Sequence, residues 1–183
     1  MPLPDDAFWE AAERELADIL FANLAACAKA GGQSALAGLG DGVSVDWSLV
    51  NQAAEQWARG MSLDLVKGIT DTSRQHAANT IADWIETGGT MDDLEAALEP
   101  MFGPTRAQLV ASTEVTRAFQ NGNRIMWSES GVVDGVRWMT AADELVCPIC
   151  GPRNGRQFGL DDEASHPPAH PRCRCYTQPV VNL

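Results

Sequence analysis

The chain has 183 residues, 45% of them apolar, and a formal net charge of −12 at pH 7, so it can bury a core and is not a disordered chain. No apolar run approaches the ~20 residues that cross a membrane, and the acidic start at Asp5 and Asp6 is unlike the basic start of a secretory signal. We therefore expect no membrane partner and a protein that is kept in a reducing compartment.

The first predicted element is an amphipathic helix over residues 5–30. Apolar side chains recur there at three- and four-residue spacings between Phe8 and Leu24, as on the buried face of a helix. Gly31 and Gly32 are expected to end this helix. The glycine-rich sequence that follows them, GGQSALAGLGDGVS, predicts a flexible connector.

A second helical stretch is expected to begin after Asp46, which is a good N-cap residue. Its apolar pattern continues to Gly88 and Gly89. Because glycine has a low helix propensity, we expect this stretch to break near Gly60 and Gly68.

Two further helices are expected before the short strand-like segments at the C-terminal end of the sequence. The capping-box pattern at residues 90–93 opens a short helix that Pro100 and Gly103 close. A last helix begins at Pro104 and runs to about residue 130, where Gly131 has the position of a C-terminal cap.

The last part of the chain predicts a small sheet. Segments 136–140, 156–160 and 175–181 are short, bounded by Gly, Pro and Asp, and typical of strands. The expected fold class is therefore α+β, with a mostly helical N-terminal part and a small C-terminal module that contains β-structure. This module also contains the motifs CPIC and HPRCRC, which a zinc ion is expected to staple together. We divide the chain into a helical, acidic arm at 1–103 and a module at 104–183.

The excess negative charge lies entirely in the first of these parts. Residues 1–103 hold 17 Asp and Glu against 5 Lys and Arg, whereas residues 104–183 hold 8 of each kind. An acidic surface repels DNA, because nucleic-acid affinity comes mainly from basic side chains that neutralise phosphates. The acidic part is either a solvated helix surface or a docking surface for a basic partner.

Four of the five cysteines lie in the last 37 residues, in the motifs CPIC and HPRCRC. A C-x2-C turn directs two sulfurs at one ion, and a zinc site closed by four protein ligands is structural. There are five candidate ligands for four places: Cys147, Cys150, His170, Cys173 and Cys175. The alternative is that these cysteines are reduced or disulfide-linked and bind no metal.

Other polar residues near these motifs have simpler interpretations. His166 precedes two prolines and is expected in an exposed, rigid turn rather than at a metal. Asp143 is expected to orient the turn into the first cysteine motif, and Glu114 and Arg117 to form an ion pair. Cys27 lies in an alanine-rich helix and is interpreted as a small buried residue.

An enzyme would need an open metal position and a general base. Acidic residues stand close to the two cysteine motifs, namely Glu144, Asp161, Asp162 and Glu163. The sequence contains no HExxH motif, no P-loop and no Ser/His/Asp set, so we predict no catalytic residue. A zinc-dependent hydrolase or nuclease is the alternative function.

Several segments together resemble the C-terminal module of the phage Mu F-like minor head proteins, a phage head morphogenesis family. They are STEVTRAFQNGNR, which contains Thr113 and Glu114, then VRWMTAADELVCPIC, NGRQF, PPAHPRCRC and QPVV. The resemblance covers about residues 105–181. Ser112 stands where members of the family often carry an arginine.

This resemblance implies a minor capsid protein of a tailed phage or prophage, assembled in the host cytoplasm and present in few copies in the virion. It would act in head morphogenesis near the portal, where DNA enters and leaves the head. The implied partners are the portal protein and/or the major capsid protein, with packaged DNA nearby and no small-molecule substrate. A third possibility is a zinc-stapled adaptor protein of the host.

Overall fold

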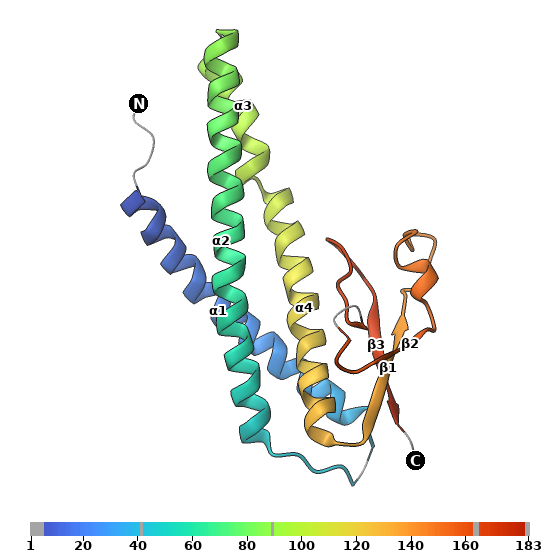
Figure 1. Cartoon of the computed structure of the whole chain (residues 1–183). Helices are drawn as coiled ribbons and strands as arrows, with labels where there is room; N and C mark the ends of the chain where they lie inside the picture. The colour runs from blue at the N-terminus through green and yellow to red at the C-terminus, as the bar shows by residue number, and fades with distance from the viewer. Residues whose placement is uncertain (1–5, 41, 89, 163–164, 182–183) are drawn as a thin grey trace.

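The computed structural model describes residues 6–40, 42–88, 90–162 and 165–181, which form helices beside a small sheet (Figure 1). The helices are α1 (Asp6–Ala37), α2 (Trp47–Thr87), α3 (Met91–Phe102) and α4 (Pro104–Ser130). The strands are β1 (Val133–Met139), β2 (Gln157–Gly159) and β3 (Tyr176–Val181), and a short 3-10 helix, η1 (Gly151–Arg153), precedes β2. The α+β fold class, mostly helical first and with a small C-terminal sheet, is confirmed.

The predicted end of α1 at Gly31 and Gly32 is wrong, because the helix continues beyond them. Gly31 lies where α1 crosses α4: a Cβ added there would lie 2.0 Å from the carbonyl oxygen of Phe119. The reverse contact is as tight, since a Cβ at Gly122 would lie 1.8 Å from the carbonyl oxygen of Ala28. The glycines therefore serve the close approach of two helix backbones and do not stop a helix.

The connector is shorter than predicted because α1 continues past Gly31 and Gly32. Of the described residues between α1 and α2, those at 38–40 and 42–46 lie outside a helix. Gly40 and Gly42 have φ angles of +81° and +103° there, which only glycine adopts at low cost.

The predicted breaks in the second helical stretch are also wrong, because α2 is one helix of 41 residues. A Cβ added at Gly60 or Gly68 would meet nothing within 4 Å, so no neighbouring element requires glycine at either position. Each glycine costs the helix only about 1 kcal/mol relative to alanine. Burial of Ala58, Ser62 and Val66 on the turns around them offsets that cost.

The predicted helix ends that depend on local capping are confirmed. The carboxylate of Asp46 accepts the backbone N–H two residues later at 2.8 Å, at the start of α2. Thr90 and Asp93 form a reciprocal capping box at the start of α3. Gly131 follows α4 with a φ angle of 66°, in the left-handed region. α3 includes Pro100 and ends shortly after it.

The sheet is antiparallel with the order β2-β1-β3, so β1 is its central strand. β1 begins at Val133, three residues before the predicted start at 136, and its register with β3 shifts between Val133 and Gly135. Gly135 has no room for a side chain, because a Cβ would lie 2.5 Å from the carbonyl oxygen of Phe158 on β2. Trp138 on β1 is completely buried and packs against the cysteine motifs.

One apolar cluster joins the helices to the sheet. Its buried members come from α1, α2, α4 and β1, and they are Ala28, Ala35, Val50, Ala54, Ile125, Met126, Trp127, Val133 and Val136. A second cluster on the same three helices comprises Leu24, Ala25, Ala58 and Ala118. The position of the sheet therefore depends on burial of residues from both ends of the chain.

Two polar contacts also fasten the C-terminal module to α4. The buried Oε1 of Gln120 accepts the backbone N–H of Thr177 at 3.3 Å and its hydroxyl at 2.7 Å. The hydroxyl oxygen of Thr113 accepts the backbone N–H of Arg172 at 3.0 Å. Each contact satisfies a polar group that would otherwise be left without a partner.

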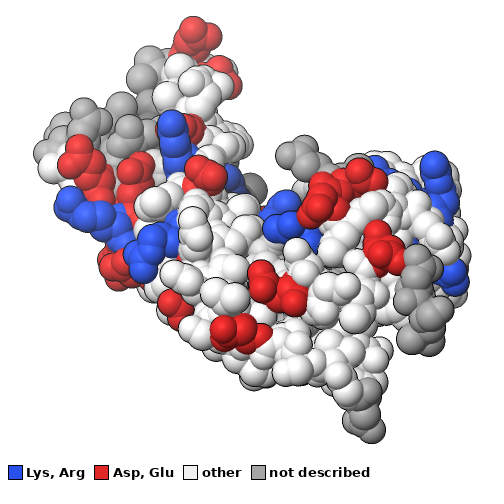
Figure 2. Space-filling model, turned by 60° about the horizontal axis from the view of Figure 1, so that its bottom comes forward, with Lys and Arg blue, Asp and Glu red and all other residues white. Residues whose placement is uncertain are grey.

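Charges of both signs alternate on the face shown in Figure 2, where Lys and Arg side chains lie beside Asp and Glu. Among the described residues on this face, Lys and Arg side chains form no extended basic surface of the kind that binds DNA. Elsewhere on the molecule Lys29 pairs with Glu55 at 2.5 Å, and Arg174 pairs with Asp143 at 2.6 Å. Within the described residues, no helix is both long enough and apolar enough to span a membrane.

Candidate metal centre

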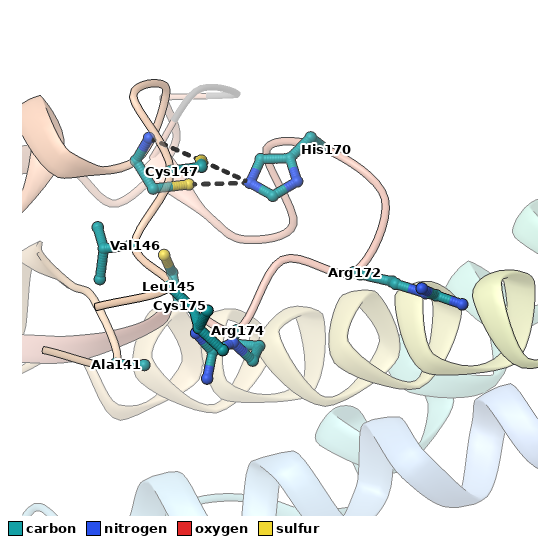
Figure 3. A pocket seen from close by; sticks show the side chains of 9 residues that line it. Ala141, Leu145, Val146, Cys147, His170, Arg172, Arg174 and Cys175 are labelled. Atoms are coloured by element: carbon teal, nitrogen blue, oxygen red, sulfur yellow. Dashed lines mark hydrogen bonds between the residues drawn. The ribbon is translucent and has the colours of Figure 1, made fainter. Parts of the chain in front are cut away.

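The first cysteine motif and His170 converge on one point. The Nε2 atom of His170 lies 3.1 Å from the Sγ atom of Cys147 and 3.3 Å from that of Cys150 (Figure 3). A tetrahedral zinc ion bound at about 2.3 Å to sulfur and about 2.0 Å to nitrogen separates those ligand atoms by about 3.5 Å. These three atoms therefore have nearly the spacing of a zinc site.

Cys150 also belongs to a second group, with Cys173 and Cys175. The Sγ atoms of Cys150 and Cys173 are 3.8 Å apart, and two thiolates on one tetrahedral zinc ion are separated by about 3.8 Å. Within each group the ligand atoms lie within 4.8 Å of one another. All five predicted ligands thus lie in two groups that share Cys150, and every one of the chain's cysteines carries a free thiol.

The backbone holds the first motif as a tight turn. The N–H of Gly151 donates to the carbonyl oxygen of Cys147 at 2.9 Å, and the N–H of Cys150 donates to the Sγ atom of Cys147 at 3.4 Å. Pro148, between the two cysteines, restrains the same turn. The two sulfurs are therefore brought together by the chain itself.

Asp143 performs the role predicted for it. Its carboxylate accepts the N–H of Leu145 at 3.0 Å and two hydrogen bonds from the guanidinium of Arg174, at 2.6 Å and 2.7 Å. The hydrogen bonds from Arg174 hold the pKa of this carboxyl below its ordinary value. Since Arg174 stands between Cys173 and Cys175, the pair links the two cysteine motifs.

The imidazole of His170 is oriented as that of a metal ligand would be. Its Nδ1 atom lies 2.8 Å from the carbonyl oxygen of Pro171, and a carbonyl oxygen only accepts hydrogen bonds. Nδ1 therefore donates in this contact, and Nε2 is the ring nitrogen that faces the two sulfurs. A backbone carbonyl commonly orients metal-binding histidines in this way.

The thiols differ in how readily they ionise. The N–H of Cys150 lowers the pKa of the Cys147 thiol to about 7, so much of it is thiolate at neutral pH. Burial raises the pKa of Cys150 and of Cys175. Buried thiols this close to one another ionise together only if a cation offsets their charge. The donor set therefore fits a bound metal ion, which would supply that charge.

The space beside the two groups is small, and no carboxylate is among the residues that line it. Its volume is about 40 Å³, enough for a few water molecules. No carboxylate of the described residues joins either group. Glu144 is exposed, Asp161 lies 3.7 Å from Arg124, and Asp162 accepts a backbone N–H at 3.0 Å. Glu163 lies outside the described residues.

His166 belongs to neither group, as predicted, but the prediction that it is exposed is wrong. It is half-buried, and its Nε2 atom lies 2.9 Å from the carbonyl oxygen of Leu160. Burial lowers the pKa of this imidazole, and the charge of Arg124 lowers it further, whereas the Leu160 carbonyl and Asp161 act in the opposite direction.

Acidification is therefore expected to destabilise the fold through His166. Because its pKa is lower in the folded than in the unfolded chain, the unfolded chain binds the proton more readily below about pH 6.5. The stability that neutral His166 provides is thus present at pH 7.5 and lost as the pH falls. Urea unfolding at pH 7.5 and 5.5 should show a smaller loss in His166→Gln than in the parent chain. An equal loss in both would assign the effect to groups other than His166.

Two buried polar residues of α4 were not predicted as part of this region. Thr113 and Gln120 are seven residues apart, which places them on the same face of the helix, and both bond to the module. Both residues lie in the segment STEVTRAFQNGNR, which carried the family resemblance, but no local pattern indicates their contacts with the module. The predicted ion pair between Glu114 and Arg117 is confirmed at 2.9 Å.

The chain matches the family described as phage Mu protein F like protein over residues 75–178. The match begins in the second half of α2, thirty residues before the expected start at 105, and it ends within β3. No curated protein and no solved structure matches the chain. Because the matched segment spans more than half of the 183 residues, this chain belongs to the phage Mu protein F like family.

Proposed function

We propose that this chain is a minor head protein of a tailed phage or prophage that acts in head morphogenesis near the portal. The observation that carries the proposal is the family match from the second half of α2 to β3. A structural, non-enzymatic role agrees with that family and with the absence of a carboxylate from the two cysteine groups of the described residues. The virion is the expected location.

In this proposal a structural zinc ion closes the C-terminal module. Four of the five candidate residues would hold it: Cys147, Cys150, His170, Cys173 and Cys175. The ion would cross-link the two cysteine motifs. A sheet of three short strands has little apolar core of its own, and such modules usually depend on a staple.

The partners in this proposal are the portal protein and/or the major capsid protein. The acidic part, residues 1–103, is the docking arm, and residues 104–183 are the compact end piece. At about 1.5 Å per residue the 41-residue α2 is roughly 60 Å long. Figure 1 shows its far end and α3 extending well beyond the sheet, where they are accessible to a partner. DNA would lie nearby without a dedicated basic surface.

Fractionation of phage particles tests the location and the partners. We expect the chain to co-sediment with filled heads in few copies per portal and to cross-link to portal or major capsid protein. Recovery of the chain only in the particle-free fraction would contradict the proposal and support a host adaptor.

Elemental analysis of protein purified without added metal tests the metal centre. We expect one zinc ion per chain and protected thiols in the C-terminal motifs. A matched assay on DNA with added Zn²⁺ or Mg²⁺ should show no cleavage. Cleavage that is lost in Cys147→Ser would instead favour the zinc-dependent nuclease.

A further inference from the structure

The contact between Thr113 and Arg172 reaches the turn that carries two of the proposed metal ligands. Thr113 is buried on α4, and its hydroxyl oxygen accepts the backbone N–H of Arg172 at 3.0 Å, from a residue 59 positions later. Arg172 lies between His170 and Cys173 in the sequence. A hydrogen bond at this position therefore acts on the backbone that directs both ligands.

The turn itself needs such support. The N–H of Cys173 donates to the carbonyl oxygen of His170 at 3.2 Å, which closes a four-residue turn with Pro171 second and Arg172 third. Arg172 has a φ angle of +58°, in the left-handed region that glycine or asparagine usually occupies at the third position of such turns. The turn has proline where proline is favoured and arginine where glycine is favoured.

The side chain of Arg172 does not explain its presence at this position. Figure 3 shows it directed away from His170 and the sulfurs. The backbone N–H, by contrast, has an acceptor of suitable chemistry. The Thr113 hydroxyl donates its own hydrogen to the carbonyl oxygen of Leu109 at 2.7 Å, so its oxygen is left to accept from Arg172.

We propose that Thr113 is a positioning residue for the metal centre: its hydroxyl holds Arg172 in the left-handed conformation and thereby fixes the spacing of His170 and Cys173. The inference rests on the proposed metal centre and names a residue of α4 that governs it. Valine at position 113 keeps the shape of threonine but cannot accept the N–H of Arg172. The turn would then relax, and the two ligands would separate.

Thr116 provides a matched control on the same helix. Its hydroxyl donates to the carbonyl oxygen of Ser112 at 3.0 Å, as that of Thr113 does to Leu109. It makes no hydrogen bond to the described residues of the module. Thr116→Val therefore removes the same kind of bond within the helix. A difference between the two variants reports the contact with Arg172.

The experiment measures transfer of zinc from the full-length, zinc-loaded protein to an excess of a chromogenic chelator. We expect Thr113→Val to release zinc about 10-fold faster than the parent chain, the scale of effect that groups supporting a metal ligand have on binding. Thr116→Val and Thr113→Ser should release it at the parent rate. Circular dichroism of each variant verifies that the helices are retained.

Replacement of Arg172 with glycine provides a rescue that a general packing defect would not show. Glycine adopts a positive φ angle without strain, so Thr113→Val combined with Arg172→Gly should recover most of the parent rate. If Thr113→Val does not fold, Arg172→Gly alone decides: it should release zinc no faster than the parent chain, and faster release would overturn the inference. Equal rates for Thr113→Val and Thr116→Val would overturn it while leaving the metal centre intact. Absence of zinc from the parent protein would overturn both.

Discussion

Replacement of Gly122 with alanine is expected to lower the free energy of unfolding by about 3 kcal/mol, the upper part of the range for overpacked sites. The added Cβ would lie 1.8 Å from the carbonyl oxygen of Ala28, and that oxygen belongs to the backbone of α1. A rotamer change cannot relieve the clash, so α1 must move away from α4. That movement would open the apolar cluster that includes Met126. Urea unfolding followed by circular dichroism measures the change.

Gly60→Ala is the matched control for this substitution. Gly60 is also in a helix, but a Cβ there would meet nothing within 4 Å. Alanine is the better helix former, so this variant should gain up to about 1 kcal/mol. If Gly122→Ala unfolded at the same urea concentration as the parent chain, the close crossing of α1 and α4 would be refuted.

Cys150→Ser is expected to abolish metal binding and to unfold the C-terminal module. Cys150 is the residue that both groups of candidate ligands share, so its loss leaves neither group complete. Structural zinc contributes on the order of 10 kcal/mol to the folding of small modules. This contribution is as large as the whole free energy of unfolding of a small domain, so the module is expected to unfold without the ion. Metal content, and protease sensitivity after α4, measure the two effects.

Cys27→Ser is the control for general effects of losing a thiol. Cys27 lies on α1, packed against the cluster that contains Leu24, and takes part in neither ligand group. This variant should keep its full metal content. A Cys150→Ser protein with unchanged metal content would show that the ion, if present, is bound elsewhere.

The helix ends could be predicted where the determining interaction is local. Asp46, Thr90 and Gly131 cap helices through contacts with residues at most four positions away, and sequence patterns record such contacts well. The glycines inside helices could not be interpreted in this way. Gly31 and Gly60 both lie inside helices, and only the contact with α4 distinguishes the helix crossing at Gly31 from the exposed position of Gly60.

In the candidate site, too, features set by neighbouring residues could be predicted from the sequence, whereas contacts between distant residues could not. The spacing of CPIC and HPRCRC was enough to name the five residues that the fold brings into two groups. The exposure of His166 was mispredicted because the residues that cover it come from other elements. The contact between Thr113 and Arg172 spans 59 positions, and no local pattern contains it.

The crossing of α1 and α4 constrains how this protein can exchange segments with its relatives. Gly31 lies before the family-matched segment, which begins at residue 75, whereas Gly122 lies inside it. Each glycine faces the backbone of the other helix, so neither position tolerates a larger residue while the helices remain in contact. A chimaera that joins α1 of this chain to the matched segment of a relative is therefore expected to fold only when that segment carries glycine at the position of Gly122.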